Sequence, residues 1–189
     1  MAESWRLFVA ATLPLEAATV IDQAIEPLRA EFPQTRWMTR DLLHLTLVFL
    51  GATDAGRLPQ IESALATVAT RHAPYTARTG EAGARIDDRP NARRGGVAWL
   101  RLADGGHETS RLALDVDAVL GGSEYDAIHS PRPHVTVARN VHHAEFEALR
   151  EVGRTLHVEW LSSRIALFRS YTSPTGSRYE AISIHQLTA

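Results

Sequence analysis

Two short segments of the sequence repeat the same pattern of histidine, apolar residue, threonine and apolar residue. The first reads HLTL and begins at His44, and the second reads HVTV and begins at His134. Successive side chains of a strand point to opposite faces, so His44 and Thr46 share one face, and His134 and Thr136 do the same in the second segment. A strand buried on both faces would use Val or Ile at these positions, because a buried polar group needs a hydrogen-bonding partner. The repeated pattern therefore predicts two strands whose polar faces line a wet cleft.

Two imidazoles that face each other across a cleft suit acid–base chemistry on a phosphate ester. One neutral histidine would take a proton from the attacking water, and one protonated histidine would donate a proton to the departing oxygen. Histidine suits both roles because its ordinary pKa lies near neutrality. The hydroxyls of Thr46 and Thr136 would donate hydrogen bonds to the non-bridging phosphate oxygens and stabilise the charge that develops there. This chemistry requires neither a metal ion nor a covalent intermediate, and we expect no cofactor.

Two other interpretations of the paired motifs stay open. The two histidines could bind zinc together with an Asp or Glu, although the motif strands contain no acidic residue. The cleft could also bind a nucleotide or an RNA phosphate without turning it over, although Lys or Arg would serve binding alone better. A single motif would fit a half-exposed strand without a function, and its repetition in the two halves of the chain argues against that reading.

The composition is that of a soluble globular protein, with 44% hydrophobic and 22% charged residues. No apolar run approaches the roughly 20 residues that a membrane-spanning helix needs, and we expect no signal peptide. Cysteine is absent, which excludes disulfides and cysteine nucleophiles and fits a cytoplasmic location. The formal net charge of -2 argues against coating of long nucleic acid, so contact with RNA should be local. Nothing indicates an obligate oligomer, and we expect a monomer.

The elements that position the motifs alternate between strands and helices. The spacing of apolar residues predicts helices at residues 15–32, 54–72, 107–120 and 143–151. Strands are predicted at residues 6–13, 44–50, 75–86, 96–102, 134–139, 155–161, 164–172 and 178–187, and a loop at residues 87–96. The segment 75–86 could be a hairpin instead of a single strand. With one motif strand in each half of the chain, this order predicts a single α+β domain over residues 1–189 that contains an internal duplication.

The motifs and their surroundings resemble the two-histidine (2H) phosphoesterases, and in particular the LigT-like RNA 2′,3′-cyclic phosphodiesterases, formerly called 2′-5′ RNA ligases. The similar segments follow the expected order over nearly the whole chain and read RLFVAATLP, RWMTRDLLHLTLVFLG, GARIDDRPNARRGGVAWL, RPHVTVARN and SSRIALFRSYTSPTGSRYE. The resemblance implies a bilobal α+β fold, in which two pseudo-symmetric lobes with antiparallel sheets surround a central groove and each contributes one HxT strand.

The resemblance also implies an activity, which is the metal-independent hydrolysis of RNA 2′,3′-cyclic phosphate termini to 2′-phosphates, with possible reverse 2′-5′ ligation. His134 would be the base that activates water, and His44 would be the acid that protonates the leaving 3′ oxygen. Thr46 and Thr136 would hold the phosphate. The implied partners are RNA ends or short oligonucleotides that carry a cyclic phosphate, and nucleotides. Another cyclic or 2′-5′ linked nucleotide is the alternative substrate within the family.

Two further residues lie five positions after the motif histidines. Arg139 stands where the family commonly has arginine, and a guanidinium beside the cleft would bind phosphate. Phe49 would either stack on a base or belong to the core. On a regular strand an offset of five places a side chain on the face opposite to the histidine, so the assignment of Arg139 depends on the strand ending near it.

Overall fold

The computed structural model describes residues 3–86, 95–121, 132–173 and 176–189, so most of the predicted loop at 87–96 lies outside the described residues. The strands are β1 (Ser4–Thr12), β2 (Arg36–Trp37), β3 (His44–Asp54), β4 (Tyr75–Arg85), β5 (Gly96–Asp104), β6 (His134–Val141), β7 (Glu159–Ser162), β8 (Arg164–Ser173) and β9 (Gly176–Gln186). The helices are α1 (Leu15–Glu31), α2 (Leu58–Ala69), α3 (Gly106–Val119) and α4 (His143–Thr155), with short 3-10 turns η1 (Arg40–Leu42) and η2 (Ala55–Arg57). None of the helices in these described ranges is both long and apolar enough to cross a membrane.

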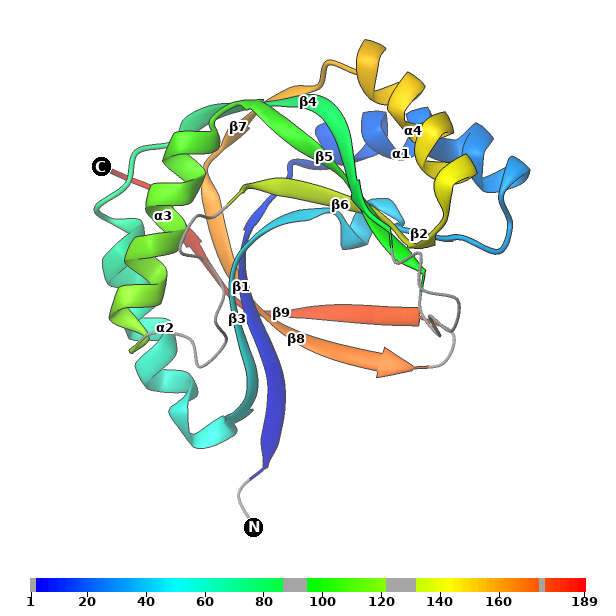
Figure 1. The fold of residues 1–189 in the computed structure, drawn as a ribbon. Coiled ribbons are helices and arrows are strands. Elements are labelled where there is room, and N and C mark those ends of the chain that lie inside the picture. The colour runs from blue at the N-terminus through cyan, green and yellow to red at the C-terminus, as the bar shows by residue number, and fades with distance from the viewer. Residues whose placement is uncertain (1–2, 87–94, 122–131, 174–175) are drawn as a thin grey trace.

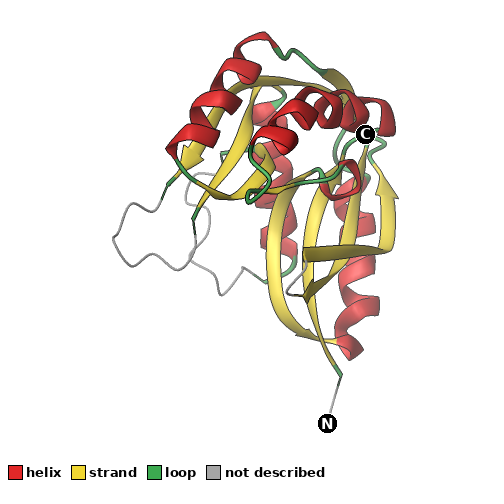
Figure 2. Cartoon of the chain, turned by 90° about the vertical axis from the view of Figure 1, so that its right-hand side faces the viewer, coloured by secondary structure: helices red, strands yellow, loops and turns green. Residues whose placement is uncertain are grey.

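The described strands form one curled antiparallel sheet in the order β7-β4-β5-β6-β3-β1-β8-β9, with β2 also paired to β6. One half contains β7, β4, β5, β6 and β2, with helices α1 and α4 outside it, and we call it the β6 lobe (Figure 1). The other half, the β3 lobe, contains β3, β1, β8 and β9, with α2 and α3 outside it. The two lobes are interleaved in sequence, and Figure 2 shows the helices of both on the outside of the strands. This is the predicted α+β architecture with one motif strand in each lobe.

The two lobes meet where β3 pairs with β6. A single residue pair, Leu45 with Val135, joins these strands, and these are the apolar residues inside the two motifs. In antiparallel pairing at this register, each motif histidine lies beside the threonine of the other motif. The motif strands therefore cross at their shared centre, which brings all four polar residues to the junction of the lobes.

Apolar side chains on the other face hold the motif strands in place. Leu45 and Leu47 of β3 and Val135 and Val137 of β6 are fully buried. Burial of each such side chain contributes roughly 1.5–3 kcal/mol of stability. The core thus fixes the direction in which the histidines and threonines point, as the alternation of the sequence predicts.

The predicted strand at residues 155–161 is wrong in its first half. Helix α4 continues to Thr155, and β7 begins only at Glu159. The segment between them is held by the side chain of Thr79 in β4, whose hydroxyl donates to the carbonyl of Leu156 and accepts from the amide of Val158. A side chain that occupies these backbone groups replaces the ladder that a strand would form. The two-residue strand β2 was also missed, because it is too short to show a periodicity.

Candidate active site

The two motif strands share a backbone irregularity. In the β1–β3 ladder and in the β5–β6 ladder the register shifts just after the motif threonine. The residue left without a partner is Leu47 after Thr46 in β3, and Val137 after Thr136 in β6. Each shift is a β-bulge, in which one extra residue is inserted into one strand of a pair. The internal duplication therefore extends beyond residue types to the backbone geometry of the two halves.

The bulges decide where the residues five positions after the histidines point. One inserted residue reverses the alternation of faces, so Phe49 returns to the face of His44, and Arg139 returns to the face of His134. Both side chains are exposed, and Phe49 is 47% exposed. A regular strand would have turned Arg139 away from His134. The strand ends two residues later, at Val141, but it is the bulge that brings Arg139 back to the face of His134.

Both ring nitrogens of His44 have hydrogen-bonding partners. Its Nδ1 lies 2.7 Å from the carbonyl oxygen of Leu42, which can only accept, so Nδ1 carries the proton. In the neutral ring Nε2 is then an acceptor, and the hydroxyl of Thr46, 2.9 Å away, donates to it. The imidazole and the threonine of the first motif thus form one hydrogen-bonded unit whose donor and acceptor reverse when Nε2 is protonated.

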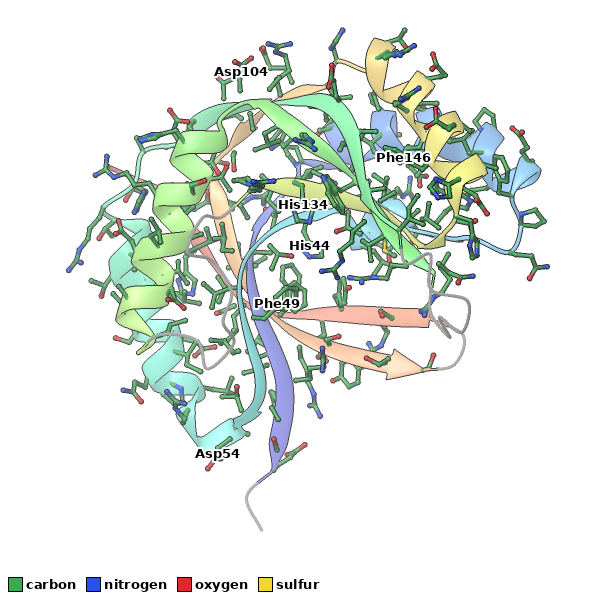
Figure 3. All side chains as sticks on the ribbon, viewed as in Figure 1. His44, Phe49, Asp54, Asp104, His134 and Phe146 are labelled. Atoms are coloured by element: carbon green, nitrogen blue, oxygen red, sulfur yellow. The ribbon has the colours of Figure 1, made fainter. Side chains whose placement is uncertain are left out.

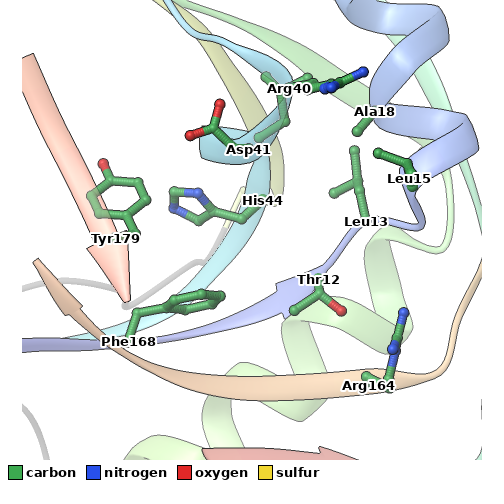
Figure 4. A pocket seen from close by; sticks show the side chains of 11 residues that line it. Thr12, Leu13, Leu15, Ala18, Arg40, Asp41, His44, Arg164, Phe168 and Tyr179 are labelled. Carbon is green, nitrogen blue, oxygen red and sulfur yellow. The ribbon is translucent and has the colours of Figure 1, made fainter. Parts of the chain in front are cut away.

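An aromatic cluster surrounds the ring of His44. The ring centroids of Phe8, Tyr179 and Phe168 lie 5.0, 5.4 and 6.5 Å from that of His44. Figure 4 shows Tyr179 and Phe168 beside the imidazole. Phe8 comes from β1, Phe168 from β8 and Tyr179 from β9, so the whole β3 lobe contributes to this cluster. Reasoning from the sequence missed these residues, since nothing local indicates that three separate strands converge on one histidine.

These surroundings lower the pKa of His44 to about 4. Desolvation by burial is the largest cause, and electrostatic repulsion from Arg139, the next cause that lowers the pKa, acts in the same direction. The hydrogen bond to the carbonyl of Leu42 raises the pKa but does not offset these effects. His44 is therefore neutral at pH 7 in the free protein. The pairing of Leu45 with Val135 brings His134 close to His44.

His134 is fixed in the same way as His44. Its Nδ1 lies 2.8 Å from the carbonyl oxygen of Arg132, two residues earlier in the chain, as Leu42 is two residues before His44. This bond keeps the proton on Nδ1 and leaves Nε2 of the neutral ring as an acceptor. The ring of Trp99, on β5, lies 5.2 Å away, centroid to centroid. Figure 3 shows both histidines on the inner side of the curled sheet.

A pocket of about 340 Å³ lies beside His44. Its walls include the apolar side chains of Leu13 and Leu15 and the charged side chains of Arg40 and Arg164 (Figure 4). The aromatic residues of the cluster, Phe168 and Tyr179, close the side next to the histidine. The pocket thus gives this histidine a partly apolar cavity whose charged lining combines these two arginines with Asp41.

The described residues offer no ligand set for the zinc alternative. No three His, Asp or Glu side chains within the described ranges are close enough together to hold a metal ion. The motif strands supply two histidines and two threonines, and threonine is not among the usual zinc ligands. The arrangement at the junction fits the binding of a phosphate between two imidazoles and two hydroxyls.

Comparison with known proteins assigns the chain to a family. The family model described as the 2′-5′ RNA ligase superfamily matches residues 17–173. The chain belongs to the 2′-5′ RNA ligase superfamily. It is 30% identical over 190 residues to an RNA 2′,3′-cyclic phosphodiesterase of Thermus thermophilus, with 94% of this chain and 87% of that protein covered. It is 27% identical over 187 residues to one of Geobacillus stearothermophilus, with 95% and 56% covered.

Solved structures of similar proteins have the same fold as this superfamily member. TT0787 of Thermus thermophilus has a TM-score of 0.69 and 28% identity, with 96% of this chain and 97% of that chain covered. E. coli LigT complexed with 3′-AMP has a TM-score of 0.68 and 26% identity, with both chains covered in full, at 100%. These comparisons confirm the resemblance and the bilobal LigT-like fold class inferred from the sequence.

Proposed function

We propose that the protein is an enzyme that hydrolyses the 2′,3′-cyclic phosphate ends of RNA to 2′-phosphates, with His44 and His134 as acid and base. The observation that carries this proposal is the duplicated site, in which both histidines donate Nδ1–H to a backbone carbonyl and leave Nε2 for chemistry. Relatives named RNA 2′,3′-cyclic phosphodiesterase support the substrate class. A single chain supplies both motifs, and cysteine is absent, which supports a monomer that works in the reducing cytoplasm.

The proposed reaction opens the cyclic phosphate by attack of water on phosphorus. Neutral His134 takes the proton of the water through Nε2 as the new P–O bond forms. His44 donates a proton to the 3′ oxygen as the P–O3′ bond breaks, so the phosphate stays on the 2′ oxygen. The hydroxyls of Thr46 and Thr136 donate to the non-bridging oxygens, and Arg139 balances the negative charge.

The low pKa of His44 adds a requirement to this scheme. An acid must be protonated when the substrate is bound, whereas His44 is neutral at pH 7 in the free protein. A cyclic phosphate carries one negative charge, which opposes the repulsion from Arg139 and raises the pKa of His44. Protonated Nε2 then donates instead of accepting, and the hydroxyl of Thr46 is free to turn to the phosphate. Substrate binding thus prepares the acid.

The pocket beside His44 has room for the nucleoside that carries the cyclic phosphate. Its volume of about 340 Å³ lies within the range of ligand pockets, roughly 300–1,000 Å³. The rings of Phe168 and Tyr179 offer faces on which a base can stack. Phe49 is 47% exposed and its ring lies 6.1 Å from that of Phe8, which supports stacking on an RNA base over a place in the core.

The proposal is tested with a short RNA that ends in a 2′,3′-cyclic phosphate, in the presence of EDTA. Wild-type protein should produce a 2′-phosphate, identified by 31P NMR. His44→Ala and His134→Ala should each lose roughly 10²–10⁴-fold in rate. His107→Ala, which removes an exposed histidine of α3, is the matched control and should retain full activity.

Several outcomes would contradict this assignment. A 3′-phosphate product would show that the 2′ oxygen leaves, whereas the proposed scheme requires the 3′ oxygen to leave. Turnover that requires added metal would favour the interpretation in which the two histidines bind zinc. Tight binding of the RNA with no product after long incubation would favour a binding module. An undiminished rate in either histidine variant would show that this histidine is not needed as acid or base.

A further inference from the structure

A tryptophan lies beside His134 on the inner face of the β6 lobe. Strand β5 pairs with β6 in a register that places Trp99 opposite Thr136. Directly opposite residues of an antiparallel pair point to the same face, so Trp99 points to the face that carries the second motif. The ring centroids of Trp99 and His134 are 5.2 Å apart. The β6 lobe therefore presents an aromatic side chain next to its motif histidine.

Gly83 of β4 makes room for the indole of this tryptophan. In the β4–β5 ladder Gly83 is the partner of Trp99. A Cβ atom at Gly83 would lie only 2.6 Å from Nε1 and 2.9 Å from Cε2 of Trp99, so the indole occupies the space that a side chain would need. Trp99 is nevertheless only partly buried. One side of the indole thus covers the glycine, and the rest of the ring is accessible from the inner side of the curled sheet.

The pseudo-symmetry of the lobes argues against a purely supporting role for this tryptophan. In the β1–β3 ladder the residue opposite the motif threonine is Ala10, whereas in the β5–β6 ladder it is Trp99. His44 is nevertheless held as His134 is, through Nδ1 and a carbonyl oxygen two residues earlier in the chain. Because a motif histidine is held in this way without an aromatic residue at this place, the indole is available to bind a ligand.

The two histidines define what lies on each side of the reacting phosphate. In the proposed scheme His44 protonates the leaving 3′ oxygen, so the nucleoside that carries the cyclic phosphate lies on that side, towards the pocket lined by Phe168 and Tyr179. The attacking and leaving oxygens lie roughly in line across phosphorus, so the attacking group enters from the side of His134. Trp99 therefore lies on the side of the nucleophile, where a base can stack on it while a hydroxyl of the same nucleoside takes the place of water.

We propose that Trp99, which lies over Gly83, is a stacking platform for a second nucleoside, whose 5′ hydroxyl attacks the cyclic phosphate in place of water. This inference rests on the proposed function and adds a second substrate to it. The 5′ hydroxyl gives its proton to Nε2 of His134 as O5′ bonds to phosphorus, and His44 protonates O3′ as the P–O3′ bond breaks. The product is a 2′-5′ phosphodiester, and the same platform holds the leaving nucleoside when such a linkage is cleaved.

A competition between water and an added hydroxyl tests the platform. The cyclic substrate is adenosine 2′,3′-cyclic phosphate, and the added hydroxyl comes either from uridine or from methyl β-D-ribofuranoside, which has the same 5′ hydroxyl but no base. At equal concentrations, the ratio of 2′-5′ diester to 2′-phosphate, measured by 31P NMR, should be at least about tenfold higher with uridine in wild type. Trp99→Leu should lose this preference, and Trp99→Phe should keep most of it, because a flat aromatic ring is retained.

The ratio of the two products separates the platform from a general loss of activity. Both products form from the same bound cyclic substrate, so a variant that merely disturbs His134 lowers both of them together. Phe168→Leu is the matched control on the other lobe, and it should weaken binding of the cyclic substrate but leave the preference for uridine unchanged. Equal ratios with uridine and the riboside in wild type, or a preference for uridine that survives in Trp99→Leu, would overturn the inference.

An NMR experiment tests the platform without turnover. The chain has four tryptophans, and the indole N–H signal of Trp99 is the one that Trp99→Phe lacks. Uridine should shift this signal in wild type without any cyclic substrate, and methyl β-D-ribofuranoside at the same concentration should not. A signal that responds to neither compound, or equally to both, would overturn the inference. The absence of both products in the competition assay, with the uridine shift present, would overturn the proposed function alone.

Discussion

The low pKa of His44 predicts a pH dependence of stability that can be measured without any substrate. The folded protein holds this pKa at about 4, whereas a histidine in an unfolded chain has a pKa of about 6.5. Between these values the unfolded chain binds a proton that folded His44 does not bind, so the free energy of unfolding falls as the pH falls. A difference of about 2.5 between the two pKa values corresponds to about 3.4 kcal/mol over the whole range.

The assay is urea unfolding of wild type and His44→Gln at pH 7.0 and pH 4.5. Over this interval His44 should account for about 2 kcal/mol of the stability that wild type loses. Other titrating groups are shared by the two proteins, so they cancel when the two losses are subtracted. His107→Gln is the control and should lose as much stability as wild type, because that side chain is exposed. Equal losses in wild type and His44→Gln would refute the reasoning, as would an NMR titration of the His44 ring with a midpoint near 6.5.

The structure makes three further predictions. The pH profile of kcat/KM should change near pH 4, where His44 titrates in the free protein. In the profile of kcat this change should occur at higher pH, because the bound phosphate raises the pKa of His44. Identical midpoints in the two profiles would contradict this. Thr46→Val should lower kcat by about 10²-fold with little change in the urea midpoint, because it removes a hydrogen-bond donor to the phosphate; an undiminished kcat would exclude that role. Gly153→Ala should destabilise the protein by about 1–3 kcal/mol, although Ala is ordinarily the better helix former. Its new Cβ in α4 would lie 2.8 Å from the amide nitrogen of Ala82, and a variant more stable to urea than wild type would show that β4 can move away.

The four motif residues could be predicted because their signal is local. A histidine and a threonine two positions apart, alternating with apolar residues, indicate which face of the strand is polar, and this needs no knowledge of the fold. The bulges at Leu47 and Val137 have no such signal, because Leu and Val are the same residues that a regular buried strand would use. For that reason the faces of Phe49 and Arg139 could not be derived from the sequence.

The rest of the site depends on which strands become neighbours. Phe8, Phe168 and Tyr179 reach His44 only because β1 lies between β3 and β8, and β9 follows β8. Arg36 faces Arg139 because β3 pairs with β6 at a single residue, so that β2 can pair with the remainder of the same edge of β6. Pairings between residues so far apart in the chain are set by packing of the whole sheet, and no local periodicity encodes them.

The central claim is that the two histidines act as acid and base on opposite sides of the phosphorus atom. It is tested most directly by a cyclic substrate in which sulfur replaces the 3′ bridging oxygen, because a thiolate leaves without needing a proton. Relative to wild type on this substrate, His44→Ala should recover most of its activity, and His134→Ala should stay inactive because the water still needs a base. Recovery of His134→Ala alone would reverse the two roles, and equal behaviour of the two variants would contradict the acid–base pair itself.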